Sequence, residues 1–476
     1  MKRVHNRPQK KVVGEVVHSL TQVIQLIDKK SYIEISDLKD LLSDAKEVII
    51  GLSNIVAVNS TNSSLPPSKD THKKKRKTKG KKRKPGGQKG HKGNHLKPVE
   101  EPTYIEELIV DRSTIPAGEY ITVGVEKRQV FDISISVVVT EYQAEILEDQ
   151  DGVQFVAEFP EGVTEQAQYG NSVKAHSVYM SQYQLIPYGR VAEYFKNQMG
   201  MALSKGSVFN WNETAYDLLQ PFSEWAFHEL VHSRCNSVDE TGINFNGKNI
   251  WLHSVSNENA VLFHADEKRG KDAMDRMGIL PKFHGVLVHD HWKPYFQYEC
   301  IHALCNAHHL RELQAAIDFD KQKWAAKMQK LLCKMNDAVI QAKKDKKTLS
   351  EDQVSAFLSL YKILLVAAEK ECPKDEKNRK QSKSRNLLTR LIDFQEETLL
   401  FLKNPLVPFT NNRGENDLRM TKVQQKISGC FKSFKGAQMF CRIRSYLLSC
   451  QRHDIEPTEA LTLLFDNKLP SFMYHK

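Results

Sequence analysis

Two aspartates lie in apolar segments that are typical of buried strands. Asp239 is in the middle of SVDETGI (237–243), and Asp290 ends GVLVHD (285–290). A carboxylate in a buried strand is costly unless it is paired or bound to a cation, and two neighbouring carboxylates repel one another. Two Mg²⁺ or Mn²⁺ ions relieve that repulsion and stabilise both oxygens of an in-line phosphoryl displacement. The pair therefore predicts a two-metal centre, although a single aspartate of this kind is usually only a strand-end residue.

A third acid is expected on a later helix, which NNRGENDLR (411–419) begins with asparagine N-caps. Glu415 shares a helix face with three basic residues at i+4, i+7 and i+11, namely Arg419, Lys422 and Lys426. We therefore predict that Asp239, Asp290 and Glu415 are catalytic metal ligands, and that Arg413 and the three basic residues bind DNA phosphates. The rival acid Asp417 lies about 200° round the helix from Glu415. The alternative is a solvated surface helix with an Arg–Glu pair.

A cluster of residues suited to zinc follows the second aspartate, and consists of Cys300, His302, Cys305, His308 and His309. Its spacing matches no two-part zinc finger. We expect it at a strand-to-helix junction, where packing or DNA contact is the alternative to metal binding. Whether His302, Cys305 and His308 bind a metal stays open.

The net charge of +11 is concentrated in one segment, because residues 73–92 hold twelve of the 69 basic residues and no acid. Such a run is expected to be disordered when free and to bind DNA phosphates without sequence preference. We name it the basic arm, with DNA contacts predicted at Lys73, Lys74, Lys75, Arg76, Lys81, Lys82, Arg83 and Lys84. The alternative is a solubility or localisation tail.

The pattern of apolar and turn residues divides the chain into seven segments. They are a helical hairpin (9–57), a basic linker (58–95), a small β-rich module (100–165), a helix-turn-helix-like segment (170–225), a first core part (233–316), an all-helical insertion (317–405) and a second core part with the Glu415 helix (406–470). The hairpin is either a self-association device or a helical cap. In the β-rich module, strands are predicted at 121–125, 130–135, 137–142 and 153–159.

The core segments have the order expected of an α/β, RNase H-like fold. Strands at 237–243, 250–255 and 260–264 precede a helix at 271–277 and the strand that ends on Asp290. Such a core places its first and fourth strands side by side. Because 124 residues separate Asp290 from Glu415, the insertion must fold apart from the core, with helices predicted at 324–346, 351–370 and 387–402.

A helix-turn-helix is predicted within 190–218, with Gly200 in the turn and Ser204 as an N-cap. Val208 and Trp211 would face inward and Lys205 outward, where it would contact DNA. A plain helical hairpin is the alternative.

Other classes are disfavoured by composition. No apolar run approaches the ~18–20 residues of a membrane span. The eight cysteines are irregularly spaced, and none precedes Cys235. We expect a reduced, cytoplasmic protein that associates with the nucleoid when bound to DNA.

The sequence resembles the insertion-sequence transposases of the IS66 type from about residue 38 onward. The resemblance is carried by PGGQKGHKG (85–93), RQVFDISISVVVTEY (128–142), VDETGINFNGKNIWLHSVS (238–256), GVLVHDHWKPYF (285–296), HALCNAHHLREL (302–313) and the segment from NNRGENDLR through CRIRSYL (411–447). It places the family's catalytic acids on Asp239, Asp290 and Glu415. Many relatives carry a cysteine zinc module around RQVFDI, which this chain cannot form because it lacks cysteines there.

The resemblance implies cleavage of DNA at element ends and strand transfer into target DNA. Because two ends must be brought together, we expect at least a homodimer on DNA, and accessory proteins are a further expected partner. Two alternatives stay open: an RNase H-like nuclease without strand transfer, and a non-catalytic, DNA-binding transposase relic.

Overall fold

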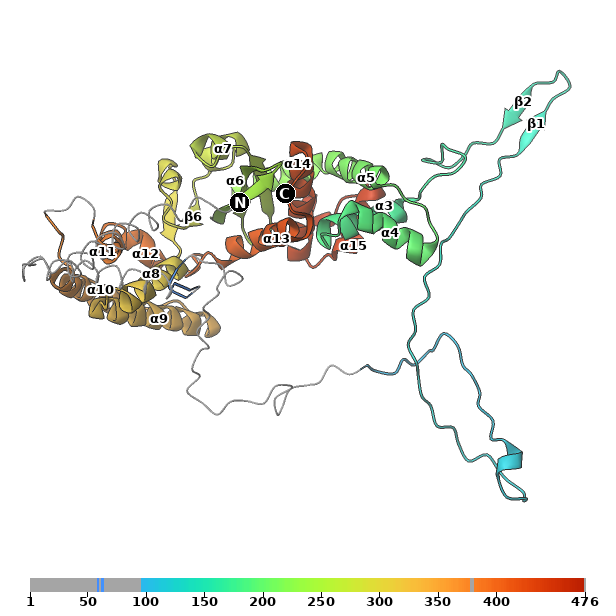
Figure 1. Cartoon of the computed structure of the whole chain (residues 1–476), viewed down its shortest axis with the longest axis horizontal. Coiled ribbons are helices and arrows are strands. Elements are labelled where there is room, and N and C mark those ends of the chain that lie inside the picture. The colour runs from blue at the N-terminus through green and yellow to red at the C-terminus, as the bar shows by residue number, and fades with distance from the viewer. Residues whose placement is uncertain (1–57, 60, 64–95, 377–380, 475–476) are drawn as a thin grey trace, which may run out of the picture. The chain divides into compact units, whose positions relative to one another are not determined.

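The computed structural model describes residues 58–59, 61–63, 96–376 and 381–474 (Figure 1). Among them, 163–193 and 203–474 belong to one compact unit, and 96–162 and 194–202 to another. The predicted hairpin at 9–57 and the basic arm lie outside the described residues. Within the described residues, no helix is both long and apolar enough to cross a membrane.

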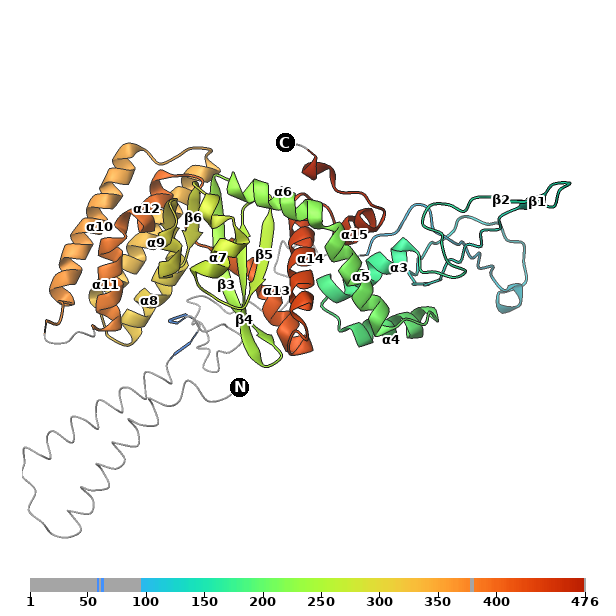
Figure 2. The same ribbon diagram turned by 90° about the horizontal axis from the view of Figure 1, so that it is seen from above.

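The larger unit is built on a five-stranded mixed sheet, so the chain is a mixed α/β protein (Figure 2). The strands lie in the order β5-β4-β3-β6-β7, and their bounds are β3 (Cys235–Phe245), β4 (Lys248–Ser256), β5 (Val261–Asp266), β6 (Val286–His289) and β7 (Ile301–Leu304). The first three are antiparallel, and β6 and β7 run parallel to β3. The predicted adjacency of the first and fourth strands is therefore confirmed.

The two faces of β3, β4 and β5 are covered by different helices, because successive side chains of a strand point to opposite faces. Ile243 and Leu252 pack with α13 (Asn412–Ser428) and α14 (Phe434–Arg452). Val238 packs on the other face with α6 (Gln220–Val231) and α7 (Lys271–Met277). The tight β3–β4 turn has positive φ at Asn246 and Gly247, as their sequence predicts.

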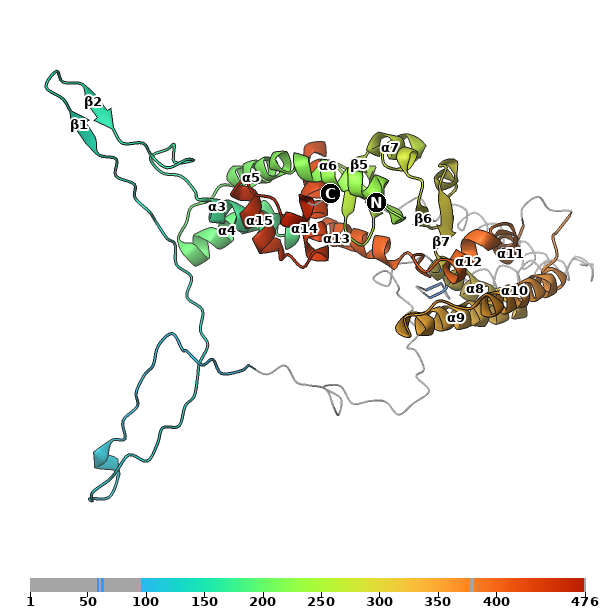
Figure 3. The ribbon, with the colours of Figure 1, turned by 180° about the vertical axis from the view of Figure 1, so that it is seen from behind.

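Five helices share a hydrophobic core with β6 and β7, in which Val286 and Val288 lie with Trp324 and Leu332. They are α8 (Asn306–Asp318), α9 (Lys323–Lys344), α10 (Glu351–Glu371), α11 (Lys383–Asp393) and α12 (Gln395–Lys403). Figure 3 shows α9 and α10 side by side. The single helix predicted at 387–402 is wrong, because the backbone leaves the helical conformation at Phe394 and divides it into α11 and α12.

The segment before the sheet is helical, as predicted. It contains α3 (Asn171–Val178), a π-helical turn (Tyr179–Tyr183), α4 (Tyr188–Met199) and α5 (Lys205–Leu218), and α3 packs against α15 (Pro457–Phe465) near the end of the chain. The predicted turn glycine Gly200 has a φ of +65°, and Ser204 caps α5 by accepting the Ser207 N–H. Val208 and Trp211 are buried and Lys205 is exposed, as predicted.

Most of the predicted strands in the smaller unit are wrong. The only strands described in this unit are β1 (Ile146–Glu148) and β2 (Gln154–Val156), which form a short antiparallel hairpin; a single 3₁₀ turn, η2 (Arg112–Thr114), precedes them. Only the strand predicted at 153–159 overlaps one of them. Residues 121–125, 130–135 and 137–142 form none, and their apolar side chains stay exposed, as at Val123. An alternating apolar pattern forms a stable sheet only when one face is covered, and no covering layer is described here.

The outer edge of β5 is closed by side chains of α14 rather than by another strand. The backbone N–H of Phe263 donates to Ser445 Oγ at 2.8 Å, and that of Val261 donates to Ser449 Oγ at 3.0 Å. Residues two apart on the strand thus meet residues four apart on the helix, since the two spacings are similar. Both serines are fully buried, so these bonds satisfy an edge that would otherwise have unpaired donors.

We predict that Ser445→Ala and Ser449→Ala each lower the free energy of unfolding by about 1–3 kcal/mol, because each leaves a buried N–H without an acceptor. Urea unfolding measures the change. Ser355→Ala, an exposed serine of α10, is the control and should be nearly neutral. Equal effects for the buried and exposed serines would contradict this role.

Candidate active site

Asp239 and Asp290 are brought together by the parallel pairing of β3 with β6. The register pairs Cys235 with Val286 and Ser237 with Val288. Asp239 lies two residues beyond Ser237, and Asp290 two residues beyond Val288, just past the end of β6. Since side chains repeat every second residue, both aspartates emerge on one face of the sheet. Asp239 also shares this face with Ile243, which packs toward α13.

Glu415 lies in the first turn of α13, which packs on β3. Asn411, the residue just before α13, is buried, and its side-chain Nδ2 donates to the Val238 carbonyl oxygen at 2.7 Å. The Asn411 carbonyl accepts the Glu415 N–H at 3.1 Å. Asn411 is the N-cap residue of α13, as predicted, but its side chain makes no capping hydrogen bond. Its amide instead attaches the helix to the strand beside Asp239.

The electrostatics of Asp239 indicate that the other two acids are close enough for their charges to act on it. Burial, followed by the charge of Glu240 and then those of Asp290 and Glu415, raises the pKa of Asp239 to about 8, although the Glu240 N–H donates to it at 2.9 Å. We name Asp239, Asp290 and Glu415 the acidic cluster. An all-carboxylate set with mutual repulsion fits Mg²⁺ or Mn²⁺, because a divalent cation favours the ionised form of each group.

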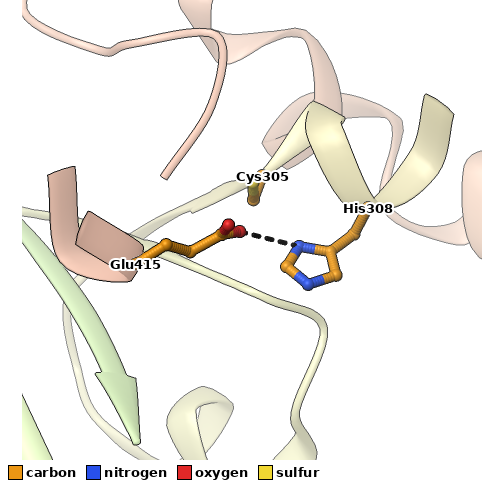
Figure 4. Close-up of side chains that lie close together, drawn as sticks. All are labelled: Cys305, His308 and Glu415. Atoms are coloured by element: carbon orange, nitrogen blue, oxygen red, sulfur yellow. Dashed lines mark ion pairs between the residues drawn. The ribbon is translucent and has the colours of Figure 1, made fainter. Parts of the chain in front are cut away.

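Glu415 also contacts a basic group from α8. Its carboxylate lies 3.2 Å from the Arg311 guanidinium. It also lies 3.9 Å from His308 Nδ1, as Figure 4 shows by a dashed line. The rival acid Asp417 instead pairs with Arg452 of α14 at 2.7 Å. As predicted from helix geometry, the two acids of α13 contact different residues.

The histidines and cysteines at the β7–α8 junction do not form the set considered from sequence. His302 Nδ1 lies 3.1 Å from His289 Nε2, whereas His309 is buried beside Asn306. Cys305 and His308 remain together, and the third ligand-type group near them is Glu415. One ligand atom from each of these three residues lies within 4.8 Å of the other two.

A second carboxylate on β3 escaped the sequence interpretation. Glu240 points to the opposite face from Asp239, where it accepts from Tyr295 and pairs with Arg269 at 2.6 Å. The Arg269 guanidinium lies 4.8 Å from the Trp251 ring and 4.3 Å from the Trp292 ring. Burial raises the pKa of Glu240, and the bonds from Tyr295 and Arg269 oppose that shift. In the sequence, the one indication of this group was the pair of adjacent acids in VDET (238–241), because adjacent residues of a strand point to opposite faces of the sheet.

The predicted DNA-binding residues of α13 are at its surface. Arg413, Arg419 and Lys426 are exposed. Lys422 is exposed too, but its ammonium donates to the Gly242 carbonyl oxygen of β3. These four basic side chains are thus exposed on the helix that carries Glu415, while DNA contact by them and by Lys205 stays a prediction.

Comparison with known families agrees with this arrangement. The model of the IS66 family of transposases matches residues 166–439, more than half of the chain. That range contains the whole five-stranded sheet and all of the acidic cluster. The protein is therefore of the transposase class, and the chain belongs to the IS66 family. Membership implies DNA binding and DNA processing, and transposases of the DDE type generally use divalent metal.

Two further comparisons add little about activity. A model described only as a family of unknown function matches residues 7–97, which include the predicted hairpin and the basic arm. No curated protein matches the chain.

We predict that Asp239→Asn stabilises the metal-free protein at pH 8 by at least about 1.4 kcal/mol. The folded state keeps the Asp239 proton up to about pH 8, whereas the unfolded chain loses it near pH 4. Wild-type stability therefore falls as the pH rises through this window, and the amide removes that loss. Urea unfolding at about pH 4 and pH 8 measures it.

The control for this pH dependence is Asp272→Asn, an exposed carboxylate of α7. Its effect should change little between the two pH values. A stabilisation by Asp239→Asn that shrinks as the pH rises would contradict the placement of Asp239 among like charges.

Proposed function

We propose that this chain is a DDE transposase that cleaves DNA at element ends and joins them to target DNA. The observation that carries the proposal is the acidic cluster: an aspartate within β3, an aspartate just past the end of the parallel strand β6, and a glutamate on a helix attached to β3. Burial, the charge of Glu240 and then the charges of the other two acids raise the pKa of Asp239, as expected at a site that binds divalent cations.

We infer that the sheet and its flanking helices form an RNase H-like core. The strand order β5-β4-β3-β6-β7, with three antiparallel strands followed by two parallel ones, supports this inference. In an RNase H-like core, α9 to α12 would be an insertion between α8 and α13. Their apolar residues form one cluster with residues of β6 and β7 and with Cys235 at the start of β3, which leaves the rest of the sheet to α13 and Glu415.

In this proposal Asp239, Asp290 and Glu415 hold two Mg²⁺ or Mn²⁺ ions. Bound there, the ions would activate a water or a DNA 3′-hydroxyl and stabilise the departing oxygen. The protein's own contribution is to hold three mutually repelling carboxylates in place and to bind the DNA backbone. We assign the second task to Arg413, Arg419, Lys422 and Lys426.

Other parts of the chain are proposed to position DNA. The basic arm would bind phosphates without sequence preference, and Lys205 on α5 would contact DNA from the helix-turn-helix-like segment. At least a dimer is expected on paired ends, with the 9–57 hairpin as a self-association element. Accessory proteins are a further proposed partner.

We predict that Asp239→Asn, Asp290→Asn and Glu415→Gln each lower Mg²⁺-dependent cleavage of element-end DNA by at least about a hundredfold, because each removes a ligand charge. Asp272→Asn should retain activity. Gel assays with uncut and precut ends measure cleavage and strand transfer separately. Cleavage that survives Asp239→Asn would contradict the proposal, and cleavage without joining of precut ends would identify a nuclease.

We also predict a positioning role for Asn411. Asn411→Ala leaves the buried Val238 carbonyl without its donor and should cost about 1–3 kcal/mol of stability. It should also reduce kcat more than KM for DNA, since DNA-binding side chains are retained while Glu415 is less well held. Unchanged kcat in a folded variant would contradict this role.

A further inference from the structure

Beside the acidic cluster lies a second group of ligand-type side chains with a different chemistry. A thiol, an imidazole and a carboxylate converge from Cys305, His308 and Glu415 (Figure 4), with one ligand atom of each within 4.8 Å of the others. The first two are on the N-cap and first turn of α8, and the third is on the first turn of α13. The group therefore bridges two helices that are distant in sequence.

The sulfur of Cys305 is placed as a metal-binding thiolate would be. The side chain is 1% exposed, and its Sγ accepts the backbone N–H of Asn411 at 3.1 Å. Burial raises the pKa of the Cys305 thiol, and the hydrogen bond from Asn411 opposes that shift. A hydrogen bond donated to sulfur and the N-terminus of a helix both favour the thiolate that a metal would bind. Because Asn411 also fixes α13 to β3, the sulfur and Glu415 are held by the same residue.

His308 supplies a nitrogen without a hydrogen-bond partner among the described residues. Its Nδ1 is shielded from solvent, and its nearest charged neighbour is the Glu415 carboxylate at 3.9 Å. A buried nitrogen of this kind normally has a partner. A cation placed between Nδ1, the sulfur and the carboxylate would provide one.

We propose that Cys305, His308 and Glu415 bind one Zn²⁺, and that zinc thereby takes Glu415 away from the acidic cluster. Thiolate and imidazole ligands select zinc over Mg²⁺, which prefers oxygen. The site is therefore an inhibitory zinc site that shares one residue with the catalytic centre. The inhibition, though not the metal binding, rests on the proposed function.

The geometry requires only a small contraction. In tetrahedral zinc sites the bond lengths of about 2.0–2.3 Å place ligand atoms roughly 3.3–3.6 Å apart, and here the three ligand atoms lie within 4.8 Å of one another. Rotation of the Glu415 and His308 side chains covers that difference. A water molecule would complete the four ligands, and the thiol proton is released to solvent on binding.

The charged side chains near the proposed zinc site have opposite effects on cation binding. Arg311, 3.2 Å from Glu415, competes with zinc for the carboxylate, and the nearby Arg390 also disfavours a cation at His308. The negative charge of Asp290 acts on His308 in the opposite sense. Zinc binding must therefore displace Arg311 from Glu415.

Cobalt(II) and zinc titrations without DNA test the site directly. We expect one equivalent of Co²⁺ to give a near-ultraviolet sulfur-to-cobalt band that Zn²⁺ removes and excess Mg²⁺ does not. Cys305→Ser should abolish the band, and His308→Ala should weaken binding of Zn²⁺ at least about tenfold.

Matched controls separate this site from other thiols. Cys333→Ser changes an exposed cysteine of α9, and Cys300→Ser changes the thiol 4.0 Å from His302 Nε2. Both should retain the band. Absence of the band in the wild type, its persistence in Cys305→Ser, or its loss in Cys300→Ser would overturn the proposal. If Cys305→Ser does not fold, His308→Ala provides the test, because His308 is partly exposed. An unchanged affinity of His308→Ala for Zn²⁺ would then overturn the proposal.

Inhibition is tested separately, as the ratio of Mg²⁺-dependent cleavage with and without one equivalent of Zn²⁺ in each variant. Zinc should inhibit the wild type and Cys333→Ser at least about tenfold more than His308→Ala. Zinc binding with equal inhibition in all variants would overturn the regulatory part. A wild type that binds zinc through these residues but cleaves no DNA would instead contradict the proposed transposase activity.

Discussion

Repulsion among ionised Asp239, Asp290 and Glu415 is the interaction that the surrounding structure has to withstand. It contributes to the raised pKa of Asp239, so above about pH 8, in the absence of a cation, separation of the ionised groups would lower the energy. The parallel register of β3 with β6 prevents separation of the aspartates. Asn411 holds the glutamate helix by its bond to Val238. The site is thus assembled by backbone pairing and one buried amide, rather than by attraction among its own side chains.

The position of α14 is likewise fixed by hydrogen bonds and an ion pair to its neighbours. Its serines satisfy the free edge of β5, and at its end Arg452 donates to the carbonyls of Asn257 and Ala260 and pairs with Asp417 of α13. One helix thereby connects the sheet edge to the helix that holds Glu415. Asp417, the rival acid by sequence, pairs with Arg452, whereas the charge of Glu415 acts on Asp239.

The sequence predicted those features that depend on local pattern. The strands around Asp239 and Asp290, the helix at 271–277 and the turn at Asn246 follow from period, apolar content and turn chemistry. The strands near 121–142 were wrong because alternation specifies a strand only when another layer covers it. Contacts between residues distant in sequence could not be predicted from local pattern. They are those of Glu240 with Arg269, Asn411 with Val238, and Glu415 with Cys305 and His308.

The central claim is that the acidic cluster holds the catalytic metal ions. It is tested most directly by anomalous X-ray scattering from crystals of the protein soaked with Mn²⁺. The account predicts manganese peaks that contact carboxylate oxygens of Asp239, Asp290 and Glu415. Manganese bound elsewhere, with these three side chains unliganded, would contradict it.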